Sequence, residues 1–585
     1  MTVTPPKRLV ILSLAAAALG LVAGGAAWAL IHLIGLLTNV ALFGRLAWEL
    51  PSFATLARSP RLIVAPVIGG FVVAVIARWV PIIRGHGIPE AMEAVLRKQS
   101  RIQPRAAIAK PLSAAIAIGT GGPFGAEGPI IVTGGALGSL LGQLLDVSPS
   151  ERKILLASGA AAGMAATFGA PLASVVLAIE LLLFEFSTRA FIPLVVASAL
   201  AGGVHSQLFG TGPLFSVPDH DFAGLGGLPL FALLGVACGL LAVLICKGLF
   251  FFEGGYRRLP VSEFWHPVIG AVGFGLVGLA VPRALGVGYD AIDGVLGGRF
   301  ALSALAVLAA AKLLAWWIAL ASGTSGGTLA PILLISGAFG GLVGGVAQAL
   351  FPAAHLSPGA FALVGMAATF GAATRATFTS IVFLFELTRD YQAILPLMLA
   401  TVLAELVAAF LLRDSLMTEK LSRRGIRVHG DYEANVLAQR TVGEVMTRAV
   451  HTLPATATVA AAQAAFAEGP HSAYPIIDAE GACVGMVSRG DLLEQRVLAQ
   501  IDEPDPSLLD VASRDLVTVA PDDLLLTALQ QMITEEIEHL PVIDATGALV
   551  GICTRTDVLR ARGGQLADER TQPGWLSPML RRGGP

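Results

Sequence analysis

Two long stretches of this sequence carry almost no charge. Residues 9–44 contain a single ionisable side chain, His32, and residues 313–374 also contain only one, His355. The whole chain of 585 residues has 14% charged residues, whereas soluble proteins have about 25%. Because about 20 apolar residues are enough for a helix to cross a bilayer, these stretches predict several transmembrane helices.

The first apolar stretch follows two basic residues, Lys7 and Arg8. A secretory signal peptide starts in the same way, but its apolar core is only about 7–15 residues long and ends at a cleavage site that is not evident here. We therefore expect an uncleaved first helix in the cell membrane. Basic residues before it predict a cytoplasmic N-terminus, and the net charge of −2 argues against a nucleic acid partner.

The composition becomes compatible with water after Lys420. We expect a membrane domain at residues 1–425 and a linker at residues 426–439. Two similar segments follow, at residues 473–493 and again 66 residues later at 539–559. Each segment reads as strand, turn, strand and helix, after an alanine-rich helical stretch. The sequence thus predicts two cytoplasmic α/β modules at residues 440–500 and 501–565, and a tail at 566–585.

The membrane domain contains an internal repeat. GMAATFGA occurs at residues 163–170 and again at 365–372, which is 202 residues later. The same offset aligns GPIIVTGGALG at 128–138 with APILLISGAFG at 330–340. Repeated halves are typical of transporters, whose substrate site lies where the halves meet. We predict a mostly α-helical membrane domain of two repeated halves. If each half crosses the membrane an odd number of times, the two halves are inverted relative to each other.

Three short segments predict where an anion would bind. Each has a glycine-rich turn followed by a proline and an apolar helix: GHGIP at 85–89, GAEGP at 125–129 and GTLAP at 327–331. The start of a helix presents free backbone N–H groups and a partial positive charge, which attract an anion without a fixed counter-charge. Broken helices can aim such ends at a site inside the bilayer. Two of the three segments occupy equivalent positions in the repeat.

These segments resemble the signature segments of the CLC chloride channel and transporter family, which read GSGIP, GREGP and GxFxP. The resemblance covers nearly the whole membrane domain, including GMAATFGA and the segment that begins at Leu384. The predicted tail modules resemble a pair of cystathionine-β-synthase (CBS) domains. The resemblance implies transport of chloride or a similar monovalent anion by a homodimer with one pore in each subunit, and it implies no enzymatic activity.

The resemblance assigns the gate to Glu127. A deprotonated carboxylate would occupy the anion pathway, and a protonated one would leave it. A lone carboxylate inside a membrane is costly and usually functional, although a glutamate that only caps a helix start is the alternative. The anion-binding positions implied by the resemblance are Gly85, His86, Gly87, Ile88, Pro89, Gly125, Gly128, Pro129, Gly327, Thr328, Leu329 and Met417.

Four residues depart from the family pattern. His86 replaces the usual serine, Ala126 an arginine, Leu329 a phenylalanine and Met417 the pore tyrosine, so both usual side-chain hydroxyls are missing. His86 can replace one of them as a ring N–H donor, in which case anion binding would strengthen on acidification. A neutral histidine in a polar pocket, with no contact to the ion, is the alternative.

The position that relays protons in coupled exchangers of this family falls on Leu181. Leucine carries no proton, so we favour uncoupled, channel-like conduction. Its neighbour Glu180 matches the first of the family's two consecutive glutamates, and the repeat counterpart Glu386 suggests a structural role at a helix end. Chloride/proton antiport is the alternative, with Glu180 or His86 as a substitute relay.

The tail carries two copies of a Ser/Thr-x-x-Asp element, which binds adenosine nucleotides in CBS pairs. The matching residues are Ser488 and Asp491 in the first copy and Thr554 and Asp557 in the second. An empty pair that only supports dimerisation is the alternative. A membrane protease would need His-Glu-x-x-His, which is absent, and a CBS-regulated cation channel would need several intramembrane carboxylates. We expect no metal site and no cofactor other than a nucleotide.

Overall fold

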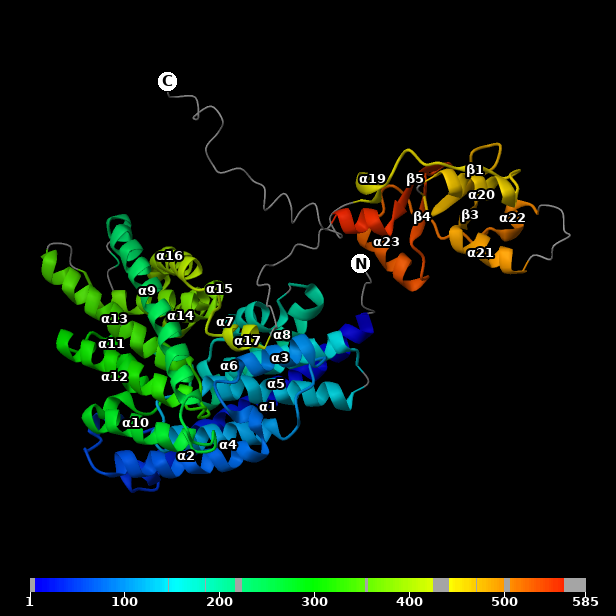
Figure 1. The fold of residues 1–585 in the computed structure, drawn as a ribbon. Helices are drawn as coiled ribbons and strands as arrows, with labels where there is room; N and C mark the ends of the chain where they lie inside the picture. The colour runs from blue at the N-terminus through cyan, green and yellow to red at the C-terminus, as the bar shows by residue number, and fades with distance from the viewer. Residues whose placement is uncertain are drawn as a thin grey trace. The chain divides into compact units, whose positions relative to one another are not determined.

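The computed structural model describes residues 6–145, 147–184, 186–215, 222, 224–352, 356–424, 441–469, 471–498 and 506–561. The chain divides between residues 431 and 432 into two compact units (Figure 1). The first is helical, and the second combines helices with short strands. The predicted boundary at residue 425, the linker at 426–439 and the tail at 566–585 lie outside the described residues.

The first unit is built from helices that pack around a common core. Two of the helices continue into short π-helical turns, η1 (Asn39–Phe43) after the first and η4 (Ile179–Leu183) after the seventh. The α-helices are α1 (Pro6–Thr38), α2 (Arg61–Trp79), α3 (Ile88–Arg97), α4 (Ala106–Gly119), α5 (Glu127–Leu144), α6 (Pro149–Phe168), α7 (Pro171–Ala178), α8 (Thr188–Leu208), α9 (Gly224–Arg257), α10 (His266–Ala280), α11 (Tyr289–Leu296), α12 (Leu302–Ala321), α13 (Leu329–Leu350), α14 (Pro358–Thr374), α15 (Thr377–Thr388), α16 (Ile394–Leu411) and α17 (Glu419–Arg423).

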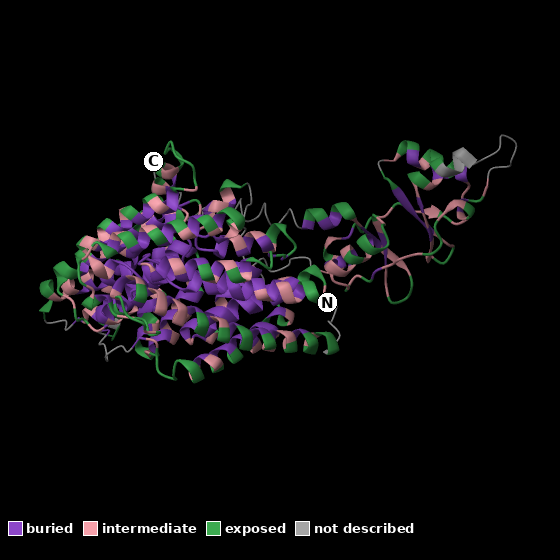
Figure 2. Ribbon diagram, turned by 90° about the horizontal axis from the view of Figure 1, so that it is seen from below, coloured by how far each residue is buried: buried purple, intermediate pink, exposed green. Residues whose placement is uncertain are grey.

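Seven helical stretches in the described part of the chain are long and apolar enough to span a bilayer. Large apolar side chains on the outside of this unit are exposed, for example Phe410 at 87% and Phe251 at 77%, as expected where lipid replaces water. Figure 2 shows buried residues concentrated along the middle of the unit. The seven stretches are Lys7–Phe43, Arg61–Trp79, Thr188–Leu208, Gly226–Arg257, Leu302–Ala321, Leu329–Leu350 and Tyr391–Leu411.

The repeated sequences form equivalent helix pairs. The two GMAATFGA segments belong to α6 and α14, which are buried over nearly their whole length. In the first pair, a Cβ atom on Gly134 of α5 would lie 2.0 Å from the carbonyl oxygen of Gly159 in α6. In the second, a Cβ on Gly340 of α13 would lie 2.3 Å from the carbonyl oxygen of Phe361 in α14. Small residues thus let each pair of backbones approach closely, as is common between membrane helices.

The two halves face each other through the starts of α5 and α13. Backbone hydrogen bonds join the residues just before these helices, Gly125 and Gly327. From this meeting point the helices run apart in Figure 1, α5 toward one side of the unit and α13 toward the other. Equivalent helices with joined N-termini and diverging bodies are the arrangement that inverted repeats produce.

The second unit contains two similar modules. In the first, β1 (Leu453–Pro454) pairs in parallel with β2 (Ala473–Ile477), which pairs antiparallel with β3 (Cys483–Ser488). In the second, β4 (His539–Ile543) and β5 (Leu549–Thr554) form the equivalent antiparallel pair. The predicted strand, turn, strand and helix pattern is present in both copies, with helical residues 555–561 following β5. The helices are α19 (Val442–Val445), α20 (Val459–Glu468), α21 (Arg489–Leu498), α22 (Leu508–Val511) and α23 (Leu525–Thr534).

Candidate functional site

The three glycine- and proline-containing segments meet at one place in the helical unit. Gly125 and Gly327 exchange two backbone hydrogen bonds, with N–O distances of 3.1 Å and 2.8 Å. The N–H group of Gly326 donates to the carbonyl of Gly85 over 3.5 Å, which joins the third segment to the other two. The starts of α3, α5 and α13 therefore converge, although the segments are far apart in the sequence.

Glycines are required because the backbones lie so close together here. A Cβ atom on Gly128 would lie 2.3 Å from the carbonyl oxygen of His86. Gly87 has a φ of +93°, a region that side chains disfavour, and caps α3. A Cβ on Gly125 would lie 1.7 Å from Oε2 of Glu127. The glycines that the sequence singled out thus create the space that the Glu127 side chain occupies.

Glu127 is the first residue of α5, and it is completely buried. Its Oε1 accepts a hydrogen bond of 2.8 Å from the hydroxyl of Tyr289. Its Oε2 is buried with no hydrogen-bond partner among the described residues, 2.9 Å from where a Cβ on Gly327 would lie. The carboxylate therefore lies between the starts of α5 and α13, where an anion would be attracted.

Two further buried polar atoms in these segments have no hydrogen-bond partner in the described part of the chain. They are Nδ1 of His86 and Oγ1 of Thr328, and both residues are at most 1% exposed. The large majority of buried side-chain polar atoms in proteins have a hydrogen-bond partner, either in the protein or in ordered water. These atoms on Glu127, His86 and Thr328 lie in segments that contact one another, so their meeting point has free hydrogen-bonding capacity for a polar species.

Two buried lysines, one in each half, hold the turns around this site. Nζ of Lys110 in α4 donates to the carbonyls of Ile83 and Gly85, at 2.7 Å and 2.6 Å. Nζ of Lys312 in α12 donates to the carbonyl of Gly286 at 2.7 Å, before α11. Lys312 thus donates to a backbone carbonyl of the other half's equivalent turn. Lys110 was not singled out from the sequence, although it stands 202 residues before Lys312, at the offset of the repeat.

The remaining predicted positions are buried around the three segments. Met417 is completely buried in the turn before α17, where its N–H group donates to Oγ of Ser415. No hydrogen bond among the described residues links Met417 to the three segments, so its predicted contact with the anion stays a prediction. The other buried positions are Ile88, Pro89, Pro129 and Leu329.

Two glutamates outside the site form a reciprocal pair between the halves. Glu180, in η4, accepts hydrogen bonds from the N–H groups of Phe378 and Thr379 at the start of α15. Glu386, in α15, accepts hydrogen bonds from the N–H groups of Leu172 and Ala173 at the start of α7. Each carboxylate thus satisfies the free first-turn donors of the opposite helix. This geometry is the helix-end role that was expected for both residues.

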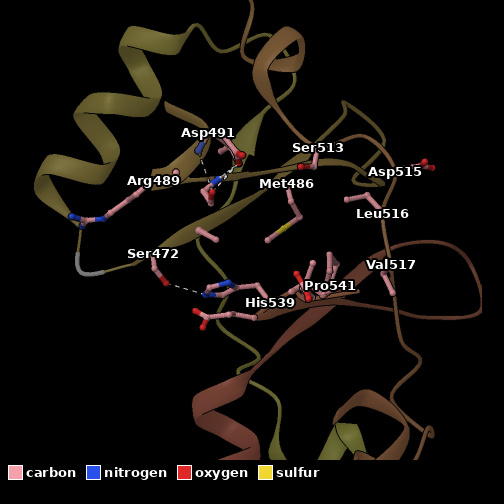
Figure 3. A pocket seen from close by; sticks show the side chains of 17 residues that line it. Ser472, Met486, Arg489, Asp491, Ser513, Asp515, Leu516, Val517, His539 and Pro541 are labelled. Carbon is pink, nitrogen blue, oxygen red and sulfur yellow. Dashed lines mark hydrogen bonds between the residues drawn. The ribbon is translucent and has the colours of Figure 1, made fainter. Parts of the chain in front are cut away.

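In the second unit, residues of both modules line a cavity of about 520 Å³ (Figure 3). Ser488 and Asp491 lie on its wall, and Oδ2 of Asp491 accepts hydrogen bonds from both the N–H and the hydroxyl of Ser488. Thr554 and Asp557 make the same pair of bonds in the second module, but they do not line this cavity. The structure therefore brings only the first of the two predicted elements to this cavity.

The charged side chains on the cavity wall are mainly acidic. Asp515, Glu536 and Glu538 line it together with Asp491, and Arg489 is its one arginine. His539 and Ser472 also line the cavity, and a hydrogen bond of 2.9 Å joins Nε2 of His539 to the hydroxyl of Ser472. Burial lowers the pKa of His539, while Glu538 and Asp557 oppose this shift.

Comparisons with known proteins agree with this architecture. The family described as "Voltage gated chloride channel" matches residues 68–409, and the CBS domain matches residues 442–497 and 508–564. The chain is 27% identical to the Arabidopsis thaliana chloride channel protein CLC-f, over 83% of this chain and 70% of that protein. It is 31% identical to an H(+)/Cl(-) exchange transporter ClcA of Vibrio campbellii, over 59% of this chain and 75% of that protein.

A solved structure of a slow cyanobacterial Cl−/H+ antiporter has the same membrane fold. It is 26% identical to this chain and superimposes with a TM-score of 0.64, covering 71% of this chain and 97% of the antiporter. The family match spans more than half of the sequence and includes the starts of α3, α5 and α13. This chain is a multi-pass membrane protein that belongs to the voltage gated chloride channel family, CLC, and carries a CBS domain pair.

Proposed function

We propose that this protein conducts chloride across the cell membrane as a homodimer, with one gated anion pathway in each subunit and a cytoplasmic CBS pair. The observation that carries this proposal is the convergence of three helix starts on a buried carboxylate and two unsatisfied polar side chains. The side chains of His86 and Thr328 supply hydrogen-bond donors in place of the serine and tyrosine hydroxyls that are usual in the family. Glu127 competes with the anion for the same positively polarised place.

Uncoupled conduction is the favoured mode. Leu181, at the position of the family's proton relay, is buried and apolar. Two backbone N–H groups of α15 donate to the carboxylate of Glu180. Protonation of Glu180 would weaken these bonds, because a neutral acid is a poorer acceptor than a carboxylate. Neither residue is therefore suited to carry protons toward Glu127. Antiport is the alternative, because the Vibrio relative and the cyanobacterial structure are named as exchangers.

The reversal potential distinguishes the two modes. We expect purified protein in liposomes to carry chloride current whose reversal potential follows the chloride gradient and does not change when a proton gradient is imposed. A Glu180→Gln variant that stays folded should behave in the same way, since we assign this residue no role in proton transfer. A reversal potential that shifts with the proton gradient would establish exchange, and the absence of any anion flux would refute the proposal as a whole.

We further propose that the cavity of the CBS pair binds an adenosine nucleotide. Its volume, and the half-buried carboxylate of Asp491 on its wall next to Ser488, suit a ribose whose hydroxyls donate to the carboxylate. Asp515, Glu536 and Glu538 would repel additional phosphates at short range. The ligand expected from this lining is a nucleoside or a monophosphate, in preference to a triphosphate.

Binding to the full-length protein in detergent tests this assignment. We expect AMP to bind more tightly than ATP, and Asp491→Ala to weaken AMP binding by about tenfold, the effect of one hydrogen bond to a charged group. The matched control is Asp557→Ala, since Asp557 does not line the cavity. If neither nucleotide binds, the pair acts as an unliganded platform. If both variants bind AMP as the wild type does, Asp491 does not hold the nucleotide and the assignment to this cavity is wrong.

A further inference from the structure

Tyr289 is a residue that no sequence motif singled out, and it contacts the centre of the anion site directly. It is the first residue of α11 and follows Gly288, whose φ is +86°. Its hydroxyl donates to Oε1 of Glu127 at 2.8 Å. Its ring packs edge-on against the buried ring of Phe215, with centroids 6.1 Å apart. The tight turn and this ring contact fix the direction in which the hydroxyl points.

The two buried lysines around this site donate their hydrogen bonds to backbone carbonyls and not to Glu127. Lys312, on α12, acts on the carboxylate through its charge but donates its hydrogen bond to the carbonyl of Gly286. Lys110, on α4, donates to two carbonyls of the turn before α3, and His86 lies in that same turn. Among the described residues, Tyr289 is therefore the one side chain that donates a hydrogen bond to the gating carboxylate.

The repeat shows that this hydroxyl is a feature of one half only. Matched by their places before α3 and α11, Gly85 and Gly87 correspond to Gly286 and Gly288, which is 201 residues later and one short of the offset of the repeat. All four have positive φ values. The residue after Gly87 is Ile88, which has no polar atom in its side chain. The equivalent turns are thus built alike, but only the second half places a donor against the carboxylate.

We propose that Tyr289 is a positioning residue that latches deprotonated Glu127 in the anion pathway. A hydrogen bond to a carboxylate is roughly twice as strong as one to a neutral acid, so the tyrosine stabilises the blocking form more than the protonated form. Tyr289 also lines a cavity of about 220 Å³ with Ser52, Phe53 and Asp290. It thereby links this cavity to the gate. The inference rests on the proposed gating role of Glu127.

Removing only the hydroxyl tests the latch. As the pH is raised, we expect chloride efflux from liposomes to decline at a higher pH in Tyr289→Phe than in the wild type. The pH of half-maximal efflux should rise by about one unit, the shift that corresponds to one charge-assisted hydrogen bond. The direction follows because the blocking carboxylate has lost a donor, so protonation and opening occur at lower proton concentration. Tyr391→Phe, at a tyrosine that is 78% exposed, is the matched control and should leave the profile unchanged.

A double variant separates the latch from a structural effect. When Glu127→Gln has already removed the carboxylate, adding Tyr289→Phe should change efflux no further. A change of equal size in both backgrounds, or an unshifted pH profile in folded Tyr289→Phe, would overturn the latch. If Glu127→Gln itself leaves efflux and its pH dependence as in the wild type, the gating proposal fails instead, so the two failures are distinguishable.

Discussion

Glu127→Gln is expected to raise chloride flux about tenfold at neutral pH and to remove its dependence on pH. The carboxylate lies at the start of α5, close to the start of α13, where a negative charge is stabilised by free N–H groups and by the helix dipoles. An advantage of about 1.4 kcal/mol, within the range for a charge at a helix start, corresponds to a factor of ten in occupancy. Glutamine keeps the size of the side chain but cannot compete as an anion. Chloride efflux from liposomes, measured between acid and neutral pH, checks this result.

Glu180→Gln is the matched control for this prediction. Its carboxylate is also held by first-turn N–H groups, but by those of α15 and not by those of α3, α5 or α13. The same chemical change should therefore weaken the contact between the halves without opening the pathway. Gating by Glu127 would be refuted if Glu127→Gln conducted as the wild type does, or if its flux kept the wild-type dependence on pH.

Much of this fold was predictable because its strongest constraints are local in the sequence. Long stretches without charge required membrane helices, and the offset of 202 residues required equivalent halves. The glycine that begins each GMAATFGA segment lies against the neighbouring helix: a Cβ on Gly163 would lie 2.6 Å from the carbonyl oxygen of Ile130 in α5, and one on Gly365 would lie 3.0 Å from that of Ser336 in α13. The three segments were recognised because a turn of glycines followed by proline is the local chemistry of a helix start.

The contacts of the site were harder to predict from the sequence, because they are made between segments that are distant in the chain. The bond between Tyr289 and Glu127 spans 162 positions, and nothing around Tyr289 marks it in advance. Lys110 is different, because the repeat offset to Lys312 could have identified it. In the tail, the two Ser/Thr-x-x-Asp elements are alike in sequence and hydrogen bonding, and only the cavity distinguishes Asp491 from Asp557.

The paired lysines lead to a second prediction of large effect. Lys110 supplies the donors for the carbonyls of Ile83 and Gly85, and Gly85 also accepts the bond that joins its turn to Gly326. Methionine fills a similar volume but donates nothing. The cost of leaving one buried polar group unsatisfied is about 1–3 kcal/mol. Without Lys110, the carbonyl of Ile83 loses this donor and the carbonyl of Gly85 keeps only the long bond from Gly326. The start of α3 could therefore move away from the other two helix starts.

Lys110→Met is expected to lower chloride flux about a hundredfold, the factor that corresponds to about 3 kcal/mol. Lys312→Met removes one such bond, to Gly286, and should lower the flux by a smaller factor of about ten. Lys247→Met, at an exposed position of α9, is the control and should leave flux unchanged. Thermal unfolding of each variant in detergent separates lost conduction from lost folding. Folded Lys110→Met that conducts like the wild type would show that the turn keeps its place without the lysine, and that the site depends on the helix starts alone.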